Sequence, residues 1–152
     1  MNYTQLYRSD NDLRTYLLVM DQGDEAVSEI TAFAKANDVN AASLTAIGAC
    51  TSATLAYFDS EKGEYINRRF IEQMEIASLI GDIADDDGQP ALHAHIVLGR
   101  HDYSALAGHL VEIHVFPTME IILTETPAHL RKRLDKATGL TLISPKDSTG
   151  AK

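Results

Sequence analysis

Three histidines form the pattern in this sequence that is best suited to chemistry. Two of them stand one residue apart in the run LHAHIVL, which is otherwise typical of a buried strand. Because side chains alternate along a strand, His93 and His95 should share one face, with Cα atoms about 7 Å apart. A third histidine, His109, begins the strand-like run HLVEIHVF. If these strands pair, three neutral imidazoles meet and form a site for zinc or another divalent first-row transition metal.

Glu120 is the candidate acidic partner of these histidines. It lies in the next strand-like run, TMEIIL, and is a candidate fourth ligand, ligand-supporting partner or general base. The alternative is structural: six histidines in 152 residues produce an H-x-H by chance in roughly one such chain in four or five. The spacing alone therefore leaves both a metal site and a hydrogen-bonded core pair open.

Other familiar chemistries find little support in the sequence. No two glycines stand one residue apart, and neither G-x-S-x-G nor G-K-[ST] occurs, which argues against nucleotide loops and serine hydrolases. The single cysteine, Cys50, sits among small residues and is expected to be a packed side chain. The acidic run that ends at Gly88 does not fit the register of a calcium loop, which predicts a solvated turn.

Composition limits the broad class of the protein. The chain has 22 acidic and 13 basic residues. Its net charge of −9 disfavours binding to the negatively charged phosphate backbone of a nucleic acid. The sequence also shows no signal-peptide pattern and no apolar run of transmembrane length, which predicts a cytoplasmic protein without membrane contact. We expect a single domain over residues 1–152, with a core at about 13–143 and a polar tail at 144–152.

Strand patterns dominate the predicted elements. A strand is expected at 14–23 and a helix at 25–37, and 41–59 should supply two strands bent or broken around Gly48. A hairpin turn follows, with Gly63 free to take a positive φ. Further strands are expected at 65–70, 74–83, 91–98, 107–115 and 119–124. Thr126 and Pro127 resemble the start of a second helix that ends at Gly139, before a last strand at 140–144. The pattern predicts a mainly antiparallel α+β domain.

The run LHAHIVLGRHDYSALAGHLVEIHVFPTMEIIL resembles the signature of the plant and prokaryote conserved (PPC) domain family, in which H-x-H, G-H-L and T-x-E-[IV] recur in this order. The similarity extends over about residues 13–142. It implies an antiparallel sheet flanked by helices, assembled as a homotrimer with the histidines near subunit boundaries. The family has a remote fold relative, acetolactate decarboxylase, whose zinc is held by an H-x-H pair and a later histidine. The matching residues here are His93, His95 and His109, with Glu120 following.

Two classes of function follow from the residues and the resemblance. The first is a trimeric regulatory or interaction module, of the type often labelled DNA-binding, with a protein partner or a small-molecule ligand. The second is a metal-dependent, zinc-type lyase or hydrolase that acts on a small oxygen-rich substrate. Plant members join the domain to AT-hooks, but this chain contains no R-G-R-P, so direct DNA binding is disfavoured. We expect the module, because Arg68, Arg69 and Arg100 show no spacing that defines a substrate clamp.

Overall fold

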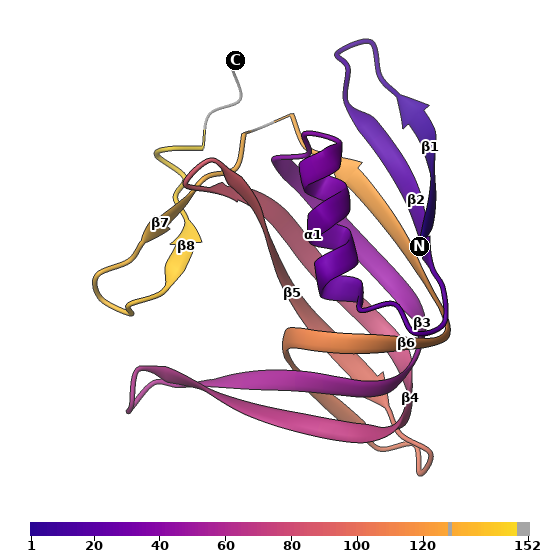
Figure 1. Ribbon diagram of the computed structural model, residues 1–152. Coiled ribbons are helices and arrows are strands. Elements are labelled where there is room, and N and C mark those ends of the chain that lie inside the picture. The colour runs from indigo at the N-terminus through magenta and orange to yellow at the C-terminus, as the bar shows by residue number, and fades with distance from the viewer. Residues whose placement is uncertain (128, 149–152) are drawn as a thin grey trace.

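The computed structural model describes residues 1–127 and 129–148. Within these ranges the chain is mostly strand, with one short helix near the N-terminus (Figure 1). The elements, in chain order, are β1 (Asn2–Arg8), β2 (Arg14–Met20), α1 (Ala26–Ala36), β3 (Ala41–Asp59), β4 (Glu64–Asp86), β5 (Gln89–Gly99), β6 (Ala105–Glu125), β7 (Lys132–Leu134) and β8 (Thr141–Ile143).

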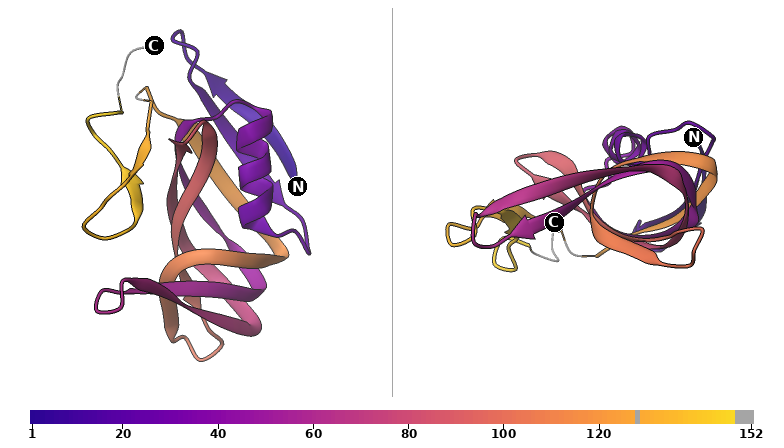
Figure 2. Two further views of the ribbon diagram at one scale, coloured as in Figure 1. Left: turned by 60° about the vertical axis from the view of Figure 1, so that its left-hand side comes forward. Right: turned by 90° about the horizontal axis from the view of Figure 1, so that it is seen from below.

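The six long strands form one antiparallel sheet that closes on itself. Their order is β1-β2-β6-β3-β4-β5, and β5 also pairs with β6, so that β3, β4, β5 and β6 make a ring. Figure 2 (right) shows this ring end-on. Closure of the sheet leaves fewer strand edges unpaired and gives each ring strand an inner and an outer face.

The ring is built from longer strands than the sequence predicts. The runs 65–70 and 74–83 lie within the single strand β4, and 107–115 and 119–124 lie within β6. The segments between these runs do not end the strands. At β-bulges the register shifts and the strand bends, and pairing continues on both sides. β1 is a strand that the sequence analysis did not anticipate.

Gly48 bends β3 without interrupting it. Its φ is +153°, and a Cβ atom at this position would lie 2.4 Å from the carbonyl oxygen of Thr118 in β6. Any side chain would therefore push β3 away from β6, so that the close approach of the two strands requires glycine. The predicted change of direction at Gly48 is present, but it is a bend within the single strand β3 and not a break between two strands.

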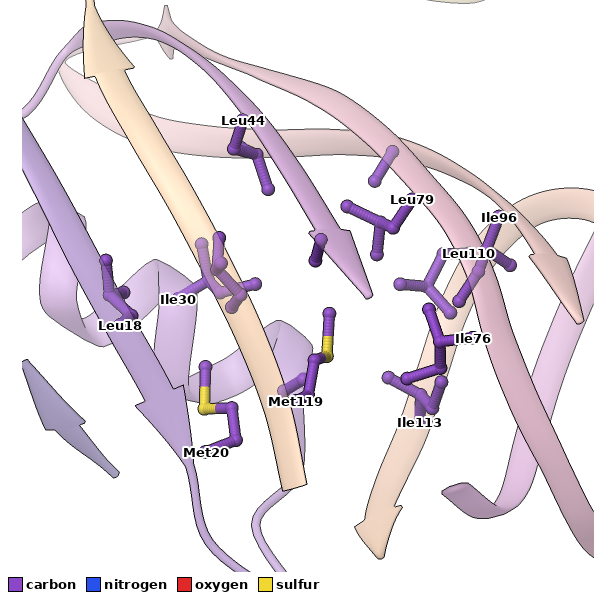
Figure 3. Close-up of a cluster of buried hydrophobic side chains, with 14 of the residues drawn as sticks. Leu18, Met20, Ile30, Leu44, Ile76, Leu79, Ile96, Leu110, Ile113 and Met119 are labelled. Atoms are coloured by element: carbon purple, nitrogen blue, oxygen red, sulfur yellow. The ribbon is translucent and has the colours of Figure 1, made fainter. Parts of the chain in front are cut away.

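The core lies between α1 and the sheet and continues into the ring. α1 packs against β5 and β6 and buries Ile30, Phe33 and Ala34, a spacing that places them on one helical face. Figure 3 shows Ile30 beside side chains from the strands, among them Leu18, Met20 and Met119. The carboxylate of Glu25 accepts hydrogen bonds from the first turn of α1 and also from the Ile113 amide, which fixes the helix to β6.

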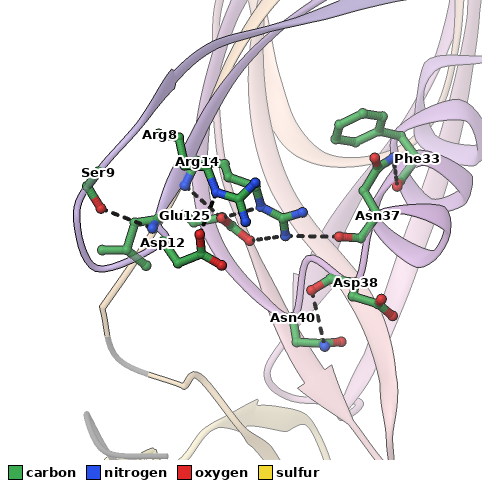
Figure 4. A network of polar contacts seen from close by, with 10 residues as sticks. Arg8, Ser9, Asp12, Arg14, Phe33, Asn37, Asp38, Asn40 and Glu125 are labelled. Atoms are coloured by element: carbon green, nitrogen blue, oxygen red, sulfur yellow. Dashed lines mark hydrogen bonds and ion pairs between the residues drawn. The ribbon is translucent and has the colours of Figure 1, made fainter.

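A polar network ties the same layers together at the opposite end of the helix (Figure 4). The guanidinium of Arg14 donates to both carboxylate oxygens of Glu125, at 2.8 and 2.6 Å, and to the carbonyl oxygen of Asn37 at 2.9 Å. These contacts join the start of β2, the end of β6 and the C-terminus of α1. Glu125 holds the pKa of Arg14 above its usual range.

The helix expected from Thr126 to Gly139 is wrong. The described residues of this segment form a loop and then a hairpin of β7 and β8, while residue 128 lies outside the described ranges. The Asp135 carboxylate accepts from the Ala137 amide and the Thr138 hydroxyl, and Gly139 has a φ of +73°. These local bonds stabilise a turn at the expense of a helix. The fold is therefore α+β with a mainly antiparallel sheet and one described helix.

No helix in the described part of the chain is long and apolar enough to cross a membrane.

Candidate metal centre

The pairing of β5 with β6 brings the three histidines together. His95 lies directly opposite His109 in this pair, and His93, two residues earlier in β5, lies on the same face. The ring centroids of the three imidazoles lie 5.3 to 5.5 Å apart. Their neighbours on β5, Ala94 and Ile96, are buried on the other face. The alternation of one strand and the register of the next therefore produce the cluster.

The geometry of this cluster fits a divalent ion. One nitrogen atom from each histidine can be chosen so that all three lie within 4.8 Å of one another. In a tetrahedral zinc site the ligand nitrogens are roughly 3.4 Å apart, so that closure requires shifts of only about 1 Å. The Nδ1 atom of His109 is buried and has no hydrogen-bond partner among the described residues. Such a buried unpaired nitrogen is the kind of atom that a metal ion satisfies.

The surroundings of the cluster favour the neutral form of the imidazoles. Burial lowers the pKa of His95, and the nearby His93 lowers it further. Burial also lowers the pKa of His109, and the nearby His93, His95 and Lys132 lower it further by charge repulsion. Because a metal binds the deprotonated nitrogen, these shifts reduce proton competition at neutral pH.

Asp82 supports the cluster from the neighbouring strand. It pairs with His93 across β4 and β5, and its Oδ2 atom lies 3.4 Å from the His93 Nδ1 atom. Its Oδ1 atom is buried and has no hydrogen-bond partner among the described residues. A carboxylate at Nδ1 orients the imidazole and leaves Nε2 free to bind a metal. Asp82 is a site residue that was not predicted from the sequence, although the turn at Asp87 and Gly88 sets the register that places it opposite His93.

A cavity of about 370 Å³ lies beside the cluster. His93, His109 and Lys132 line it together with the ring of Tyr65, which lies 5.0 Å from the His109 ring. The remaining wall is made largely by the β7 and β8 hairpin. The sequence analysis did not anticipate Lys132 at this site, because the segment that carries it was expected to be helical.

Glu120 is not brought to the histidines. It is exposed, and it pairs with Val19 on β2 and Ile47 on β3, whereas His109 pairs with Ala56 and His95. The bent course of β6 between positions 109 and 120 separates the two sites. Glu120 lies instead beside Ile47 and Ile122 on the outside of the sheet. In the described part of the chain it has no contact through which to act as a ligand or base for the cluster.

Cys50 is buried in the core, and burial raises the pKa of its thiol to about 11. A thiol with this pKa is almost entirely protonated near neutral pH and is a poor nucleophile. The expectation that Cys50 is a packed side chain is therefore confirmed.

The sequence profile of the Plants and Prokaryotes Conserved (PCC) domain matches residues 7–127 of the chain. This is the PPC family, and the chain belongs to it. The match includes the three histidines and Asp82, but it ends before Lys132 and the β7 and β8 hairpin. The comparison with curated proteins found no match.

Solved structures from several organisms share this fold. A Bacteroides thetaiotaomicron protein, provisionally described as DNA-binding, is 30% identical with a TM-score of 0.86, covering 95% of this chain and 98% of its own. A PPC protein of Pyrococcus horikoshii is 35% identical with a TM-score of 0.82, covering 88% and 93%. A protein of Archaeoglobus fulgidus described as metal-containing is also 35% identical, with a TM-score of 0.79 and coverage of 86% and 92%.

A more distant likeness reaches beyond the family. A Staphylococcus aureus protein of unknown function, described as similar to α-acetolactate decarboxylase, has a TM-score of 0.53 at 10% identity. The match covers 72% of this chain and 51% of the other. At this level of identity it shows a shared fold and carries no information about the reaction.

Proposed function

We propose that this protein is a metal-binding PPC module in which His93, His95 and His109 hold one zinc ion or another divalent first-row ion. The observation that carries the proposal is the convergence of three imidazoles from β5 and β6, with one buried nitrogen that no described residue pairs with. The metal-containing description of the Archaeoglobus relative supports it. Three protein ligands leave one coordination position for water or a ligand.

We further propose that the module works as a homotrimer. Three exposed isoleucines, Ile47, Ile80 and Ile122, lie on the outer face of β3, β4 and β6, with exposed fractions of 60%, 65% and 43%. Ile80 and Ile122 both pair with Thr45, so that they flank the same point of β3. We call these three residues the isoleucine patch. An apolar patch that spans three strands is suited to burial against further copies of the chain.

We propose that this module binds a protein or a small molecule, and that it does not bind DNA. Two of the solved relatives are provisionally described as DNA-binding, but this chain carries a net charge of −9. Its densest basic run is Arg131, Lys132 and Arg133, and the structure weakens it as a phosphate-binding surface. Lys132 is buried, and the Nε atom of Arg133 lies 3.7 Å from a carboxylate oxygen of Asp147. A buried, disulfide-free cysteine is compatible with the cytoplasmic location that we also propose.

The cavity beside the histidines favours a second candidate function, that of a metal-dependent lyase or hydrolase. When bound, a divalent ion polarises an oxygen of a small substrate or activates a water molecule. In this chain the residues that would surround such a substrate are Tyr65 and Lys132. Turnover of an oxygen-rich substrate that stops when the metal is removed would favour this candidate over the module.

Metal analysis of tag-free protein tests the proposed metal site. Protein that has been stripped and reloaded with zinc is expected to retain about one equivalent after desalting. His93→Ala and His95→Ala should each lose most of this zinc, while Glu120→Gln should retain it because Glu120 lies apart from the cluster. Retention below about 0.2 equivalents, or unchanged uptake by the histidine variants, would show that no such site exists.

A further inference from the structure

Lys132 lines the cavity, and the metal site does not explain its presence there. Its exposed fraction is 8%, and it is one of only two polar or charged side chains in the described residues that are this deeply buried. Among the described residues its ammonium group forms neither an ion pair nor a hydrogen bond. Most of the residue is covered, and its positive charge is left without a counter-charge from the described residues. The side chain lines the cavity, which is where a counter-charge can reach it.

The charge around the cavity points to an anionic ligand. A divalent ion on the neutral histidines would add two positive charges to that of Lys132. Asp82, the carboxylate that contacts His93, offsets one of them. The remaining positive charge stands in a partly enclosed space, where electrostatic attraction is stronger than in open water. An anionic oxygen group that reaches both Lys132 and the open metal position satisfies both cations.

The walls of the cavity restrict the rest of the ligand. Leu92, Leu140, Leu142 and Ile143 line it with hydrocarbon, and Tyr65 adds an aromatic ring. A volume of about 370 Å³ is near the lower limit for small-molecule sites. The space therefore suits a ligand of few atoms with an apolar part next to its charged group, and an inorganic anion would leave this wall without a partner.

We propose that the cavity binds a short-chain carboxylate, with its anionic group between Lys132 and the metal-binding histidines and its hydrocarbon part against the hairpin. The inference rests on the proposed function for the metal, while Lys132 and the apolar wall belong to the chain itself. Most of this wall comes from residues 140–143, which lie beyond the region matched by the family profile. Ligand preference is thus assigned to the C-terminal hairpin, and metal binding to the family core.

Titration of cobalt-loaded protein tests this inference, because the visible absorption of Co²⁺ reports a new ligand in its coordination sphere. The probes are acetate, butyrate and inorganic phosphate. Butyrate is expected to bind roughly tenfold more tightly than acetate, because its two additional methylene groups are buried against the hairpin. Phosphate is expected to bind more weakly than butyrate.

Variants at the cavity separate the role of Lys132 from that of the metal ligands. Lys132→Met keeps an unbranched side chain that is one atom shorter and removes the charge, and it should weaken butyrate binding about tenfold or more while metal content stays unchanged. Leu142→Ala should reduce the preference for butyrate over acetate. Lys62→Met, which removes an exposed lysine near Asp59, should leave both properties unchanged.

The outcomes distinguish this inference from the proposed function. If the protein holds metal but Lys132→Met binds butyrate as tightly as the wild type, the carboxylate site is wrong and the metal site stands. Tighter binding of phosphate than of butyrate also overturns it. If the protein holds no metal, the proposed function fails, and calorimetry of butyrate with the metal-free protein and Lys132→Met then decides whether the carboxylate site exists without it.

Discussion

Asp82 on β4 and His93 on β5 face each other across an antiparallel pair, with the carboxylate Oδ2 atom 3.4 Å from the imidazole Nδ1 atom. This relationship places the carboxylate on the Nδ1 side of the His93 ring, which favours Nε2 as the nitrogen that binds a metal. Three strands of the ring therefore contribute to the candidate site. β4 supplies the orienting group, and β5 and β6 supply the ligands.

Replacement of Asp82 should weaken metal binding without abolishing it. Asp82→Asn removes the negative charge that orients His93, and we expect zinc affinity to fall roughly 10 to 100-fold. Competition with a chelator of known affinity measures this change. Asp87→Asn is the matched control, because Asp87 lies in the turn of the same hairpin with a φ of +49°, which asparagine tolerates. Equal affinities for Asp82→Asn and the wild type would remove Asp82 from the site.

Zinc affinity should depend on pH in a defined window. Zinc competes with protons for the imidazole nitrogens, and burial lowers the pKa of His95 and of His109 below the usual value of about 6.5. A lowered pKa keeps the neutral form present to a lower pH, so affinity should be nearly flat from about pH 8 to 6.5 and decrease below it. A steep loss between pH 8 and 7 in a chelator competition series would contradict this assignment.

The backbone beside His93 requires glycine in the neighbouring strand. A Cβ atom on Gly81 would lie 2.7 Å from the carbonyl oxygen of His93, which is too close for the strand pair to accept without moving. Gly81→Ala is therefore expected to lower the free energy of unfolding by about 1 to 3 kcal/mol in a denaturant titration. Gly99→Ala is the control, since its Cβ would meet its nearest atom at 3.7 Å, an ordinary contact. Similar stabilities of the two variants would refute this steric account.

The isoleucine patch should determine the oligomeric state. Size-exclusion chromatography with light scattering is expected to give three times the mass of one chain at micromolar concentration. Ile80→Glu should shift this mass toward that of one chain, because a charge in an apolar contact is costly to bury. Tyr103→Glu changes a residue that is 98% exposed in a loop, and should leave the mass unchanged. A monomer mass for the wild type would contradict the proposed trimer.

Direct DNA binding should be absent at physiological salt. Nonspecific binding draws its free energy from lysines and arginines that displace counterions, and this chain has 13 basic against 22 acidic residues and a net charge of −9. Fluorescence anisotropy with a mixed-sequence duplex at roughly 150 mM salt is expected to show no saturable binding below about 10 μM. Saturable binding that is weakened by replacing Arg131 and Arg133 with alanine would overturn this prediction.

The features that the sequence predicts well are those that depend on alternation within a strand. The shared face of His93 and His95 follows from a period of two, and the burial of Ala94 and Ile96 follows from the same pattern. The spacing of Ile30 and Phe33 likewise predicts the buried face of the helix. Such local periodicities are visible in a single sequence because core and surface impose them on neighbouring residues.

The features that the sequence did not reveal depend on contacts between distant segments. Glu120 follows His109 in a strand-like run, but at Glu120 β6 pairs with β2 and β3 and no longer with β5, so Glu120 lies several strands away from the histidines. The C-terminal segment has the local signals of a helix start and stop, yet side-chain bonds at Asp135 favour a turn, and Lys132 then reaches the cavity. The position of Asp82 opposite His93 could have been predicted by counting outward from the turn between β4 and β5. The position of Lys132 could not, because no local pattern places it near a histidine.

Anomalous diffraction from a crystal of the zinc-loaded protein would locate the metal ion that we propose His93, His95 and His109 bind. Data collected on both sides of the zinc absorption edge should show one peak per chain, about 2.0 to 2.1 Å from a nitrogen atom of each of the three histidines. The absence of a peak at the cluster in crystals of zinc-loaded protein, or a peak bound only by residues elsewhere on the surface, would contradict the claim.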